Sequence, residues 1–167
     1  MFLNKNIYSN YFSAETKKFV KYSIYMHFMV SMLIVLQFIF HFGSKYSQIE
    51  FPDVPKPLIW QYIWITSLVP GLAGYLSLKN NRLSMLMFYY RGTILLGFGP
   101  VLTTMVFNAS DLLDYARNKQ TTNVFHDFPV IVLWYIYLFV VIQIHAFGIY
   151  FARILIKSWS KDAKKVK

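Results

Sequence analysis

The side chains that could do chemistry are few, and most of them lie inside apolar stretches. His27 and Gln37 fall in one such stretch, Gln143 and His145 fall in the last one, and Arg91 lies about two helical turns into a third. Polar groups at membrane depth point either to a functional site or to hydrogen bonds between helices. The first interpretation is a proton relay, a polar substrate site or, more weakly, a metal site. We favour packing, because no carboxylate lies in these stretches and a proton or cation transporter usually places one there.

No motif of a known catalytic chemistry accompanies these residues. H-E-x-x-H, G-x-S-x-G and a glycine-rich phosphate loop before a helix are absent from the sequence. The chain has no cysteine, which excludes disulfides, thiolate metal sites and cysteine nucleophiles. Asp111 and Asp114 fit a solvated loop with an Asp capping a short helix better than a catalytic pair. The sequence therefore predicts no enzyme, metal or cofactor, and a small intramembrane enzyme or transporter remains the alternative.

Composition indicates which solvent the chain is built for. Its 167 residues are 56% hydrophobic and 14% charged, against about 45–50% apolar and about 25% charged in a soluble domain. The net charge of +10 could suggest a nucleic-acid partner. However, the cations form short blocks between apolar stretches, which is the pattern that orients membrane helices. We therefore predict an all-α membrane protein that binds no nucleic acid.

Four stretches are long and apolar enough to cross a bilayer, which takes about 20 helical residues. The predicted spans are about residues 22–42, 57–78, 83–107 and 129–151. Trp60 and Trp64 open the second span, one turn apart, as expected for an interfacial aromatic belt. Pro70 interrupts the same span, and Gly97 and Pro100 weaken the third. Residues 22–151 would thus form a four-span domain.

The charge of the segments between the spans predicts their orientation. Residues 1–21 carry +3, the turn at 79–82 together with Arg91 carries +3, and the tail 152–167 carries +5. The two longer loops carry 0 and −1. By the positive-inside rule both termini and the turn are cytosolic. Residues 1–21 fit either an amphipathic helix on the membrane or a loosely ordered tail. The glycosylation sequon at Asn108 lies close to the membrane, so we expect it to be unused.

The basic tail divides into two parts. Arg153, Lys157 and Lys161 are spaced four residues apart, so they line one side of a helix that would be attracted to anionic lipid at about 1 kcal/mol each. Lys164 and Lys165 stand fourth and third from the carboxyl end. That position is typical of the dilysine retrieval signal that the vesicle coat (coatomer) reads on endoplasmic-reticulum membrane proteins. The alternative is a chance pair in a Lys-rich tail.

Several motifs along the chain carry a resemblance to a known family. They are Tyr25-Met26-His27, Pro70-Gly71-Leu72, Asn80-Asn81, Val141–Ala146 (VIQIHA), Tyr150-Phe151 and Ser158-Trp159. With the loop lengths, over about residues 17–167, they resemble Jagunal proteins, which are four-span proteins of the endoplasmic-reticulum membrane. The N-terminal 16 residues are not covered, and Arg91 departs from the apolar character expected there.

The resemblance implies a multi-pass protein of the reticulum membrane with a role in reticulum organisation. It also implies a role in vesicle-mediated transport and exocytosis in the early secretory pathway, with the vesicle coat as a partner and no enzymatic activity. A homo-oligomer is compatible with this interpretation. A scaffold that wedges short hairpins into one leaflet is disfavoured by spans of this length.

Overall fold

The computed structural model describes residues 2–46, 56–119, 124–125 and 128–165, with the side chains of residues 2–12, 125 and 161–165 outside that description. The elements in chain order are α1 (Phe2–Tyr46), α2 (Ile59–Ile65), α3 (Leu68–Asn80), α4 (Leu83–Gly92), the π-helical turn η1 (Thr93–Phe98), α5 (Gly99–Phe107), α6 (Ala109–Asn118), β1 (Val124–Phe125), β2 (Phe128–Pro129) and α7 (Val130–Lys165).

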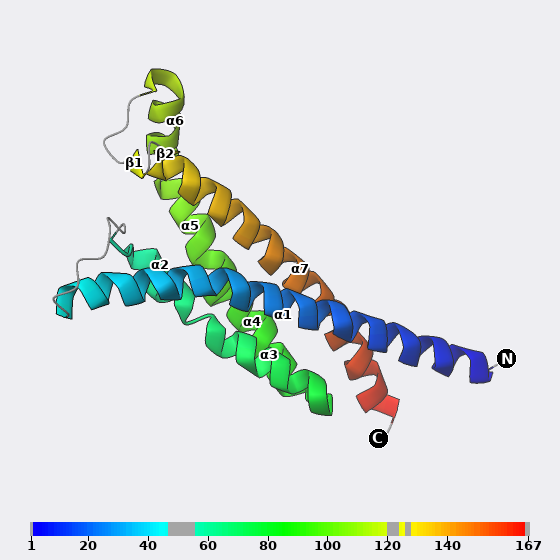
Figure 1. Cartoon of the computed structure of the whole chain (residues 1–167). Helices are drawn as coiled ribbons and strands as arrows, with labels where there is room; N and C mark the ends of the chain where they lie inside the picture. Colours follow the sequence, from blue (N-terminus) through cyan, green and yellow to red (C-terminus); the bar gives the residue numbers. More distant parts are fainter. Residues whose placement is uncertain (1, 47–55, 120–123, 126–127, 166–167) are drawn as a thin grey trace.

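The helices form one elongated bundle. α1 packs against α7 and α3, and α4 packs against α3 and α7. Both chain termini lie at the same end of the bundle, which we call the terminal end, and α6 with the two short strands lies at the opposite, loop end (Figure 1). The strands pair antiparallel, with Phe125 opposite Phe128, and lead directly into α7.

Three helical segments in the described part are long and apolar enough to cross a membrane. They are Ser13–Tyr46, Leu83–Phe107 and Val130–Ser160. The protein is therefore an all-α membrane protein, apart from its two-residue strands. Residues 2–21, for which the sequence left a helix and a loose tail open, are helical and continuous with the rest of α1.

The predicted second span is divided into two helices. α2 ends at Ile65 and α3 begins at Leu68, so that Pro70 falls in the first turn of α3. The backbone N–H groups in the first turn of a helix have no acceptor within the helix, so a proline, which lacks this N–H, costs little there. Inside a continuous helix, a proline would remove the hydrogen bond to the carbonyl four residues before it. At the break, the amide N–H groups of Val69 and Gly71 donate to the carbonyls of Thr66 and Ser67, each at 3.1 Å. The interruption expected at Pro70 is thus a short break just before it.

The third apolar segment is continuous but contains one turn of π-helix between α4 and α5. Pro100 follows this turn and has no N–H to donate. The amide of Gly99 bonds to the carbonyl of Ile94, five residues back, which is the π-helical pattern. The extra residue in this turn changes which side chains of α5 face the bundle. π-Helical turns are frequent at functional sites.

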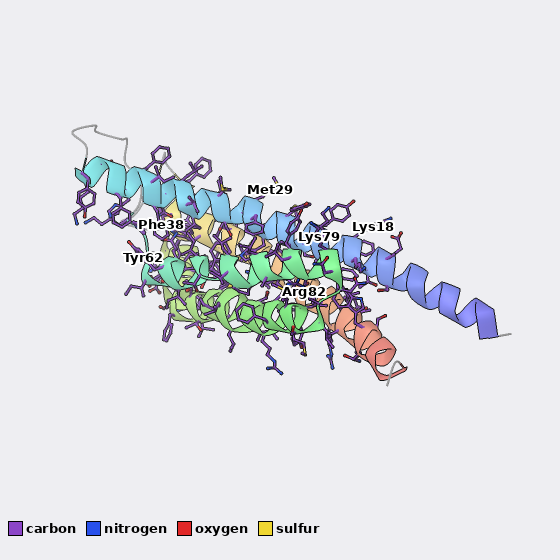
Figure 2. The ribbon with its side chains drawn as sticks, turned by 90° about the horizontal axis from the view of Figure 1, so that it is seen from below. Lys18, Met29, Phe38, Tyr62, Lys79 and Arg82 are labelled. Atoms are coloured by element: carbon purple, nitrogen blue, oxygen red, sulfur yellow. The ribbon has the colours of Figure 1, made fainter. Side chains whose placement is uncertain are left out.

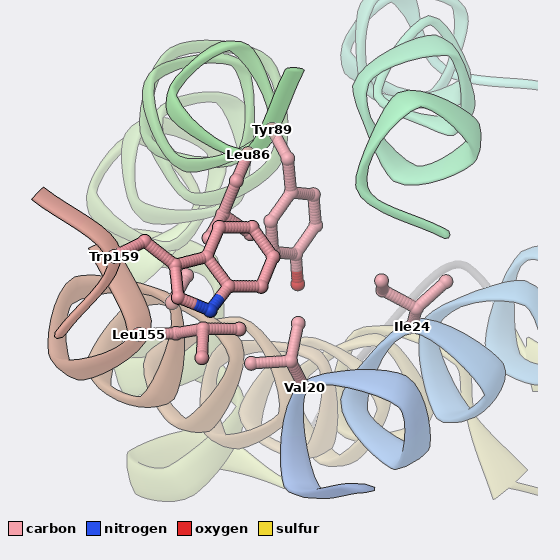
Figure 3. Packing of buried hydrophobic residues seen from close by; sticks show 7 residues of the cluster. Val20, Ile24, Leu86, Tyr89, Leu155 and Trp159 are labelled. Atoms are coloured by element: carbon pink, nitrogen blue, oxygen red, sulfur yellow. The ribbon is translucent and has the colours of Figure 1, made fainter. Parts of the chain in front are cut away.

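The buried apolar side chains form two clusters, one near each end. The terminal-end cluster joins α1, α4 and α7 through Val20, Ile24, Leu86, Tyr89, Ala152, Leu155 and Trp159 (Figure 3). The loop-end cluster joins α1, α2, α5 and α7 through Ile34, Trp60, Trp64, Val101, Leu138 and Val141. Trp60 and Trp64 are only 8% and 0% exposed, so the prediction of a lipid-facing aromatic belt is wrong. Spacing of one turn fits a buried helix face equally well.

Candidate functional site

A buried polar cluster lies between the two apolar clusters and draws on four segments of the chain. His27 comes from α1, Trp64 from α2, Ser67 from the break before α3, and His145 from α7. The two imidazole rings meet edge to face, with their centroids 4.6 Å apart. The Ser67 hydroxyl is 2.9 Å from Nε2 of His27, and the Trp64 indole N–H donates to Nε2 of His145 at 3.0 Å. We call these four residues the histidine cluster.

The histidine cluster is closely packed. Its members are at most 3% exposed. Gly97 of η1 lies against His145, and a Cβ at that position would come 2.9 Å from Cε1 of the ring. Gly71 lies against His27 in the same way, with its Cβ position 3.6 Å from Nδ1. Neither the groove of about 200 Å³ between α1 and α7 nor the cavity of about 30 Å³ beside Trp60 is lined by a histidine.

The hydrogen bond from Trp64 defines the protonation of His145. An indole N–H can only donate, so Nε2 of His145 must accept and carries no hydrogen. The neutral ring then carries its hydrogen on Nδ1. His27 can either donate to or accept from the Ser67 hydroxyl. Among the described residues no group of three or more His, Asp or Glu side chains could hold a metal. The contacts of the histidine cluster join α1, α2, the break before α3 and α7.

A second buried hydrogen bond joins α1 to α2 closer to the loop end. The Gln61 side-chain amide donates to Oε1 of Gln37 at 2.6 Å. The backbone N–H of Leu58 donates to Oε1 of Gln61, which caps the start of α2. Gln61 is fully buried and Gln37 nearly so. Interhelical bonds of this kind contribute about 0.5–1.5 kcal/mol each within a membrane.

The remaining predicted polar residues do not join either group. Arg91 and Gln143 are exposed on the surface of the bundle, although the sequence offered both as interhelical contacts. Gln143 lies two residues from His145, which places the two side chains on nearly opposite faces of α7. The alternative site built from His27, Arg91, Gln143 and His145 is therefore not assembled: the structure brings only its two histidines together.

The histidine partners were not predicted as site residues. The spacing of Trp64 from Trp60 predicts an interfacial aromatic belt, and no motif in the sequence singles out Ser67, or Gln61 as the partner of Gln37. A usable signal existed, because Gln61, Trp64 and Ser67 follow one another at spacings of three residues and so share one face of a helical segment.

The two ends of the chain pack against each other at the terminal end. The Trp159 indole N–H donates to the Ser13 hydroxyl at 3.2 Å, and the Lys17 ammonium lies 5.6 Å from the centroid of the same indole. The rings of Phe19 and Phe151 stack at 4.7 Å. The apolar face of the α7 tail is thus covered by α1.

The predicted basic residues of the tail are only partly described. Arg153 and Lys157 are exposed on the side of α7 that α1 leaves open. The side chain of Lys161 lies outside the described residues. Lys164 and Lys165 are the last two residues of α7, and their side chains also lie outside the described residues.

Long apolar helices that are joined by buried hydrogen bonds define a helical membrane protein. The family model described as "Jagunal, ER re-organisation during oogenesis" matches residues 5–163. The chain therefore belongs to the Jagunal family, as its motifs suggested.

Named relatives extend over most of the chain. It is 30% identical over 156 residues to the protein jagunal homolog of Caenorhabditis briggsae, covering 89% of this chain and 82% of that protein. It is 27% identical to the protein jagunal of Drosophila melanogaster, covering 88% and 80%. It is 26% identical to the protein jagunal homolog 1 of Homo sapiens, covering 93% and 83%. None of these names is that of an enzyme.

Proposed function

We propose that this protein is a multi-pass protein of the endoplasmic-reticulum membrane that supports reticulum organisation and vesicle-mediated transport, including exocytosis, in the early secretory pathway. The observation that carries this proposal is the family match over residues 5–163, whose description names re-organisation of the endoplasmic reticulum. The absence of a catalytic motif in the sequence agrees with a role that depends on contacts rather than on a reaction.

The chain crosses the membrane four times, with both termini on the cytosolic side. In this arrangement α2 and α3 together make the second crossing. The break between them is compatible with a span because Ser67 and Gly71 are buried against other helices, and irregular backbone at membrane depth is tolerated where protein surrounds it. The α3–α4 turn at Asn81 adopts the left-handed conformation and makes the second and third crossings an antiparallel hairpin. The positive charge of both ends and of this turn supports the orientation.

Lys164 and Lys165 are the recognition element for coatomer in this proposal. From Phe151 to Lys164, the helical rise of α7 is about 20 Å, enough to carry the pair beyond the lipid headgroups. The contact between Trp159 and Ser13 fixes the direction in which the tail leaves the bundle. Arg153, Lys157 and Lys161 hold this helix at the anionic membrane surface.

The proposal is tested by replacing Lys164 and Lys165 with serine in the full chain. The double variant is expected to move forward to the Golgi or the cell surface, and affinity capture is expected to lose coatomer subunits. Arg153→Ser/Lys157→Ser is the matched control, since it removes the same charge from the same helix and should keep reticular localisation. Unchanged localisation and capture of Lys164→Ser/Lys165→Ser would rule out the assignment.

A further inference from the structure

The outer surface between α1 and α3 carries two lysines and two tyrosines in matching order. Lys21 and Tyr25 are one turn apart on α1, and Tyr75 and Lys79 are one turn apart on α3. Tyr25 is 41% exposed and Tyr75 is 40% exposed, and both lysines are exposed. None of the four contributes to either apolar cluster or to the histidine cluster. Their side chains therefore lie outside the buried packing of the bundle.

Contacts across the helix pair bring these residues together. The rings of Tyr25 and Tyr75 lie 5.9 Å apart, and the Lys21 ammonium is 5.4 Å from the centroid of the Tyr25 ring. α1 and α3 run in opposite directions (Figure 1). Lys21 precedes its tyrosine and Lys79 follows its own, so both lysines lie one turn nearer the terminal end than the tyrosine pair. Figure 2 shows Lys79 at that end of α3.

The surface changes in the same order along both helices. One turn further toward the middle of the bundle, Met29 follows Tyr25 and Leu72 precedes Tyr75, and these side chains are 67% and 52% exposed. Each helix thus presents a cation, then a phenol, then an aliphatic side chain. A phospholipid presents a charged phosphate, then glycerol esters, then acyl chains. The rise from Lys21 to Met29 is about 12 Å, which spans this change in the lipid.

Charge at this surface selects the kind of lipid. α3 contains no acidic residue, and Glu15 is the one acidic residue of α1. Its carboxylate already pairs with Lys18 at 2.8 Å. Among the residues that the structure describes, neither lysine forms an ion pair, so both present positive charge that attracts an anionic headgroup and repels the quaternary ammonium of phosphatidylcholine. The hydroxyls of Tyr25 and Tyr75 interact with each other, which leaves one phenol O–H to donate to a phosphate or ester oxygen.

We propose that Lys21, Tyr25, Tyr75 and Lys79 form a binding site for an anionic phospholipid on the α1–α3 face. The lysines bind the phosphate, the tyrosines contact the headgroup and ester region, and the acyl chains lie along Met29 and Leu72. With the proposed topology this lipid belongs to the cytosolic leaflet. The site is separate from the basic face of α7 and from Lys164 and Lys165, so it can be tested independently of the trafficking proposal.

The test uses the purified full chain in detergent, titrated with phosphatidylinositol, phosphatidylserine or phosphatidylcholine and followed by native mass spectrometry. The wild-type chain is expected to retain the two anionic lipids in preference to phosphatidylcholine. Lys21→Gln/Lys79→Gln should lower the affinity for the anionic lipids about 25-fold, since each lysine near an anionic headgroup changes binding roughly fivefold. Lys21→Arg/Lys79→Arg should retain the affinity.

A matched control lies at the other end of α1. The Lys45 ammonium is 5.6 Å from the ring centroid of Tyr46, which reproduces the lysine–tyrosine pair without a counterpart on α3. Lys45→Gln should leave anionic-lipid binding unchanged. Wild-type affinity in Lys21→Gln/Lys79→Gln, or an equal loss in Lys45→Gln, would overturn the proposal. The proposal would also be overturned if soluble glycerophosphoinositol bound as tightly as phosphatidylinositol, because the acyl-chain contacts would then contribute nothing.

Discussion

The indole N–H of Trp64 donates to Nε2 of His145, joining α2 to α7 across 81 positions of the sequence. Both side chains are almost completely buried, so neither has water as an alternative partner. His27 lies between them and the Ser67 hydroxyl, with its ring 5.5 Å from that of Trp64. Because Trp64 lies just before the break between α2 and α3 and Ser67 lies within it, the histidine cluster holds the interrupted segment in place at two points.

Replacing Trp64 with phenylalanine should destabilise the protein by about 1–2 kcal/mol beyond the lost ring volume, because Nε2 of His145 would remain buried without a donor. The measurement is thermal unfolding of the purified chain in detergent, followed by circular dichroism. His145→Leu supplies the partner for a double-mutant cycle, in which the combined cost should be smaller than the sum of the single costs. Additive costs would show that the bond contributes nothing to stability.

Position 97 requires a glycine because the ring of His145 packs directly against its backbone. Gly97→Ala would place its Cβ 2.9 Å from Cε1 of His145, and should cost about 1–3 kcal/mol of unfolding free energy. Gly71→Ala is the matched control beside the other histidine, because its Cβ would lie at an ordinary contact distance of 3.6 Å from Nδ1 of His27. The same thermal unfolding assay compares the two variants. Equal midpoints would mean that η1 does not pack tightly against α7.

The sequence predicts the two histidines of the histidine cluster but not their partners, because the partners depend on the helix break, which hydrophobic periodicity does not reveal. His27 and His145 stood out because each is ionisable within an apolar stretch. Their partners did not, because the break between α2 and α3 determines which face of that segment meets the other helices. Trp64 at a span entrance has the same spacing from Trp60 whether it faces lipid or protein.

Other assignments failed for a simpler reason. Depth in an apolar stretch predicts an interhelical contact for Arg91 and Gln143, but a membrane helix also has an outer surface, and both side chains are exposed on it. For Gln143 the error could have been avoided, since two residues correspond to about 200° of rotation around a helix. If His145 faces the bundle, Gln143 faces away from it. For Arg91, no neighbouring residue of known orientation indicates which face of the helix it occupies.

Gly148 gives a test of how closely α4 and α7 pack. A Cβ at this position would come 2.6 Å from the Tyr89 hydroxyl oxygen, so Gly148→Ala should lower the unfolding midpoint, at a cost of about 1–3 kcal/mol. Adding Tyr89→Phe removes the obstructing oxygen and should recover part of that loss, whereas Tyr89→Phe alone should not stabilise the protein. If the double variant were no more stable than Gly148→Ala, the steric clash of the new Cβ would not be with the Tyr89 hydroxyl.

The four-span topology can be tested cleanly because the chain contains no cysteine. A single cysteine introduced at Asn80, exposed at the end of α3, should react with a membrane-impermeant maleimide applied to the cytosolic side of sealed microsomes. A cysteine at Ser110, exposed on α6, should react only after the membrane is opened with detergent. A cysteine at Lys56, exposed just before α2, should be protected in the same way, because Lys56 and Asn80 lie on opposite sides of the broken segment. Equal labelling at Lys56 and Asn80 would mean that α2 and α3 do not cross. The wild-type chain is the control, since it offers the reagent no thiol. Labelling at Asn80 and protection at Lys56 would together require the broken segment to traverse the bilayer, which is the step that the histidine cluster would stabilise.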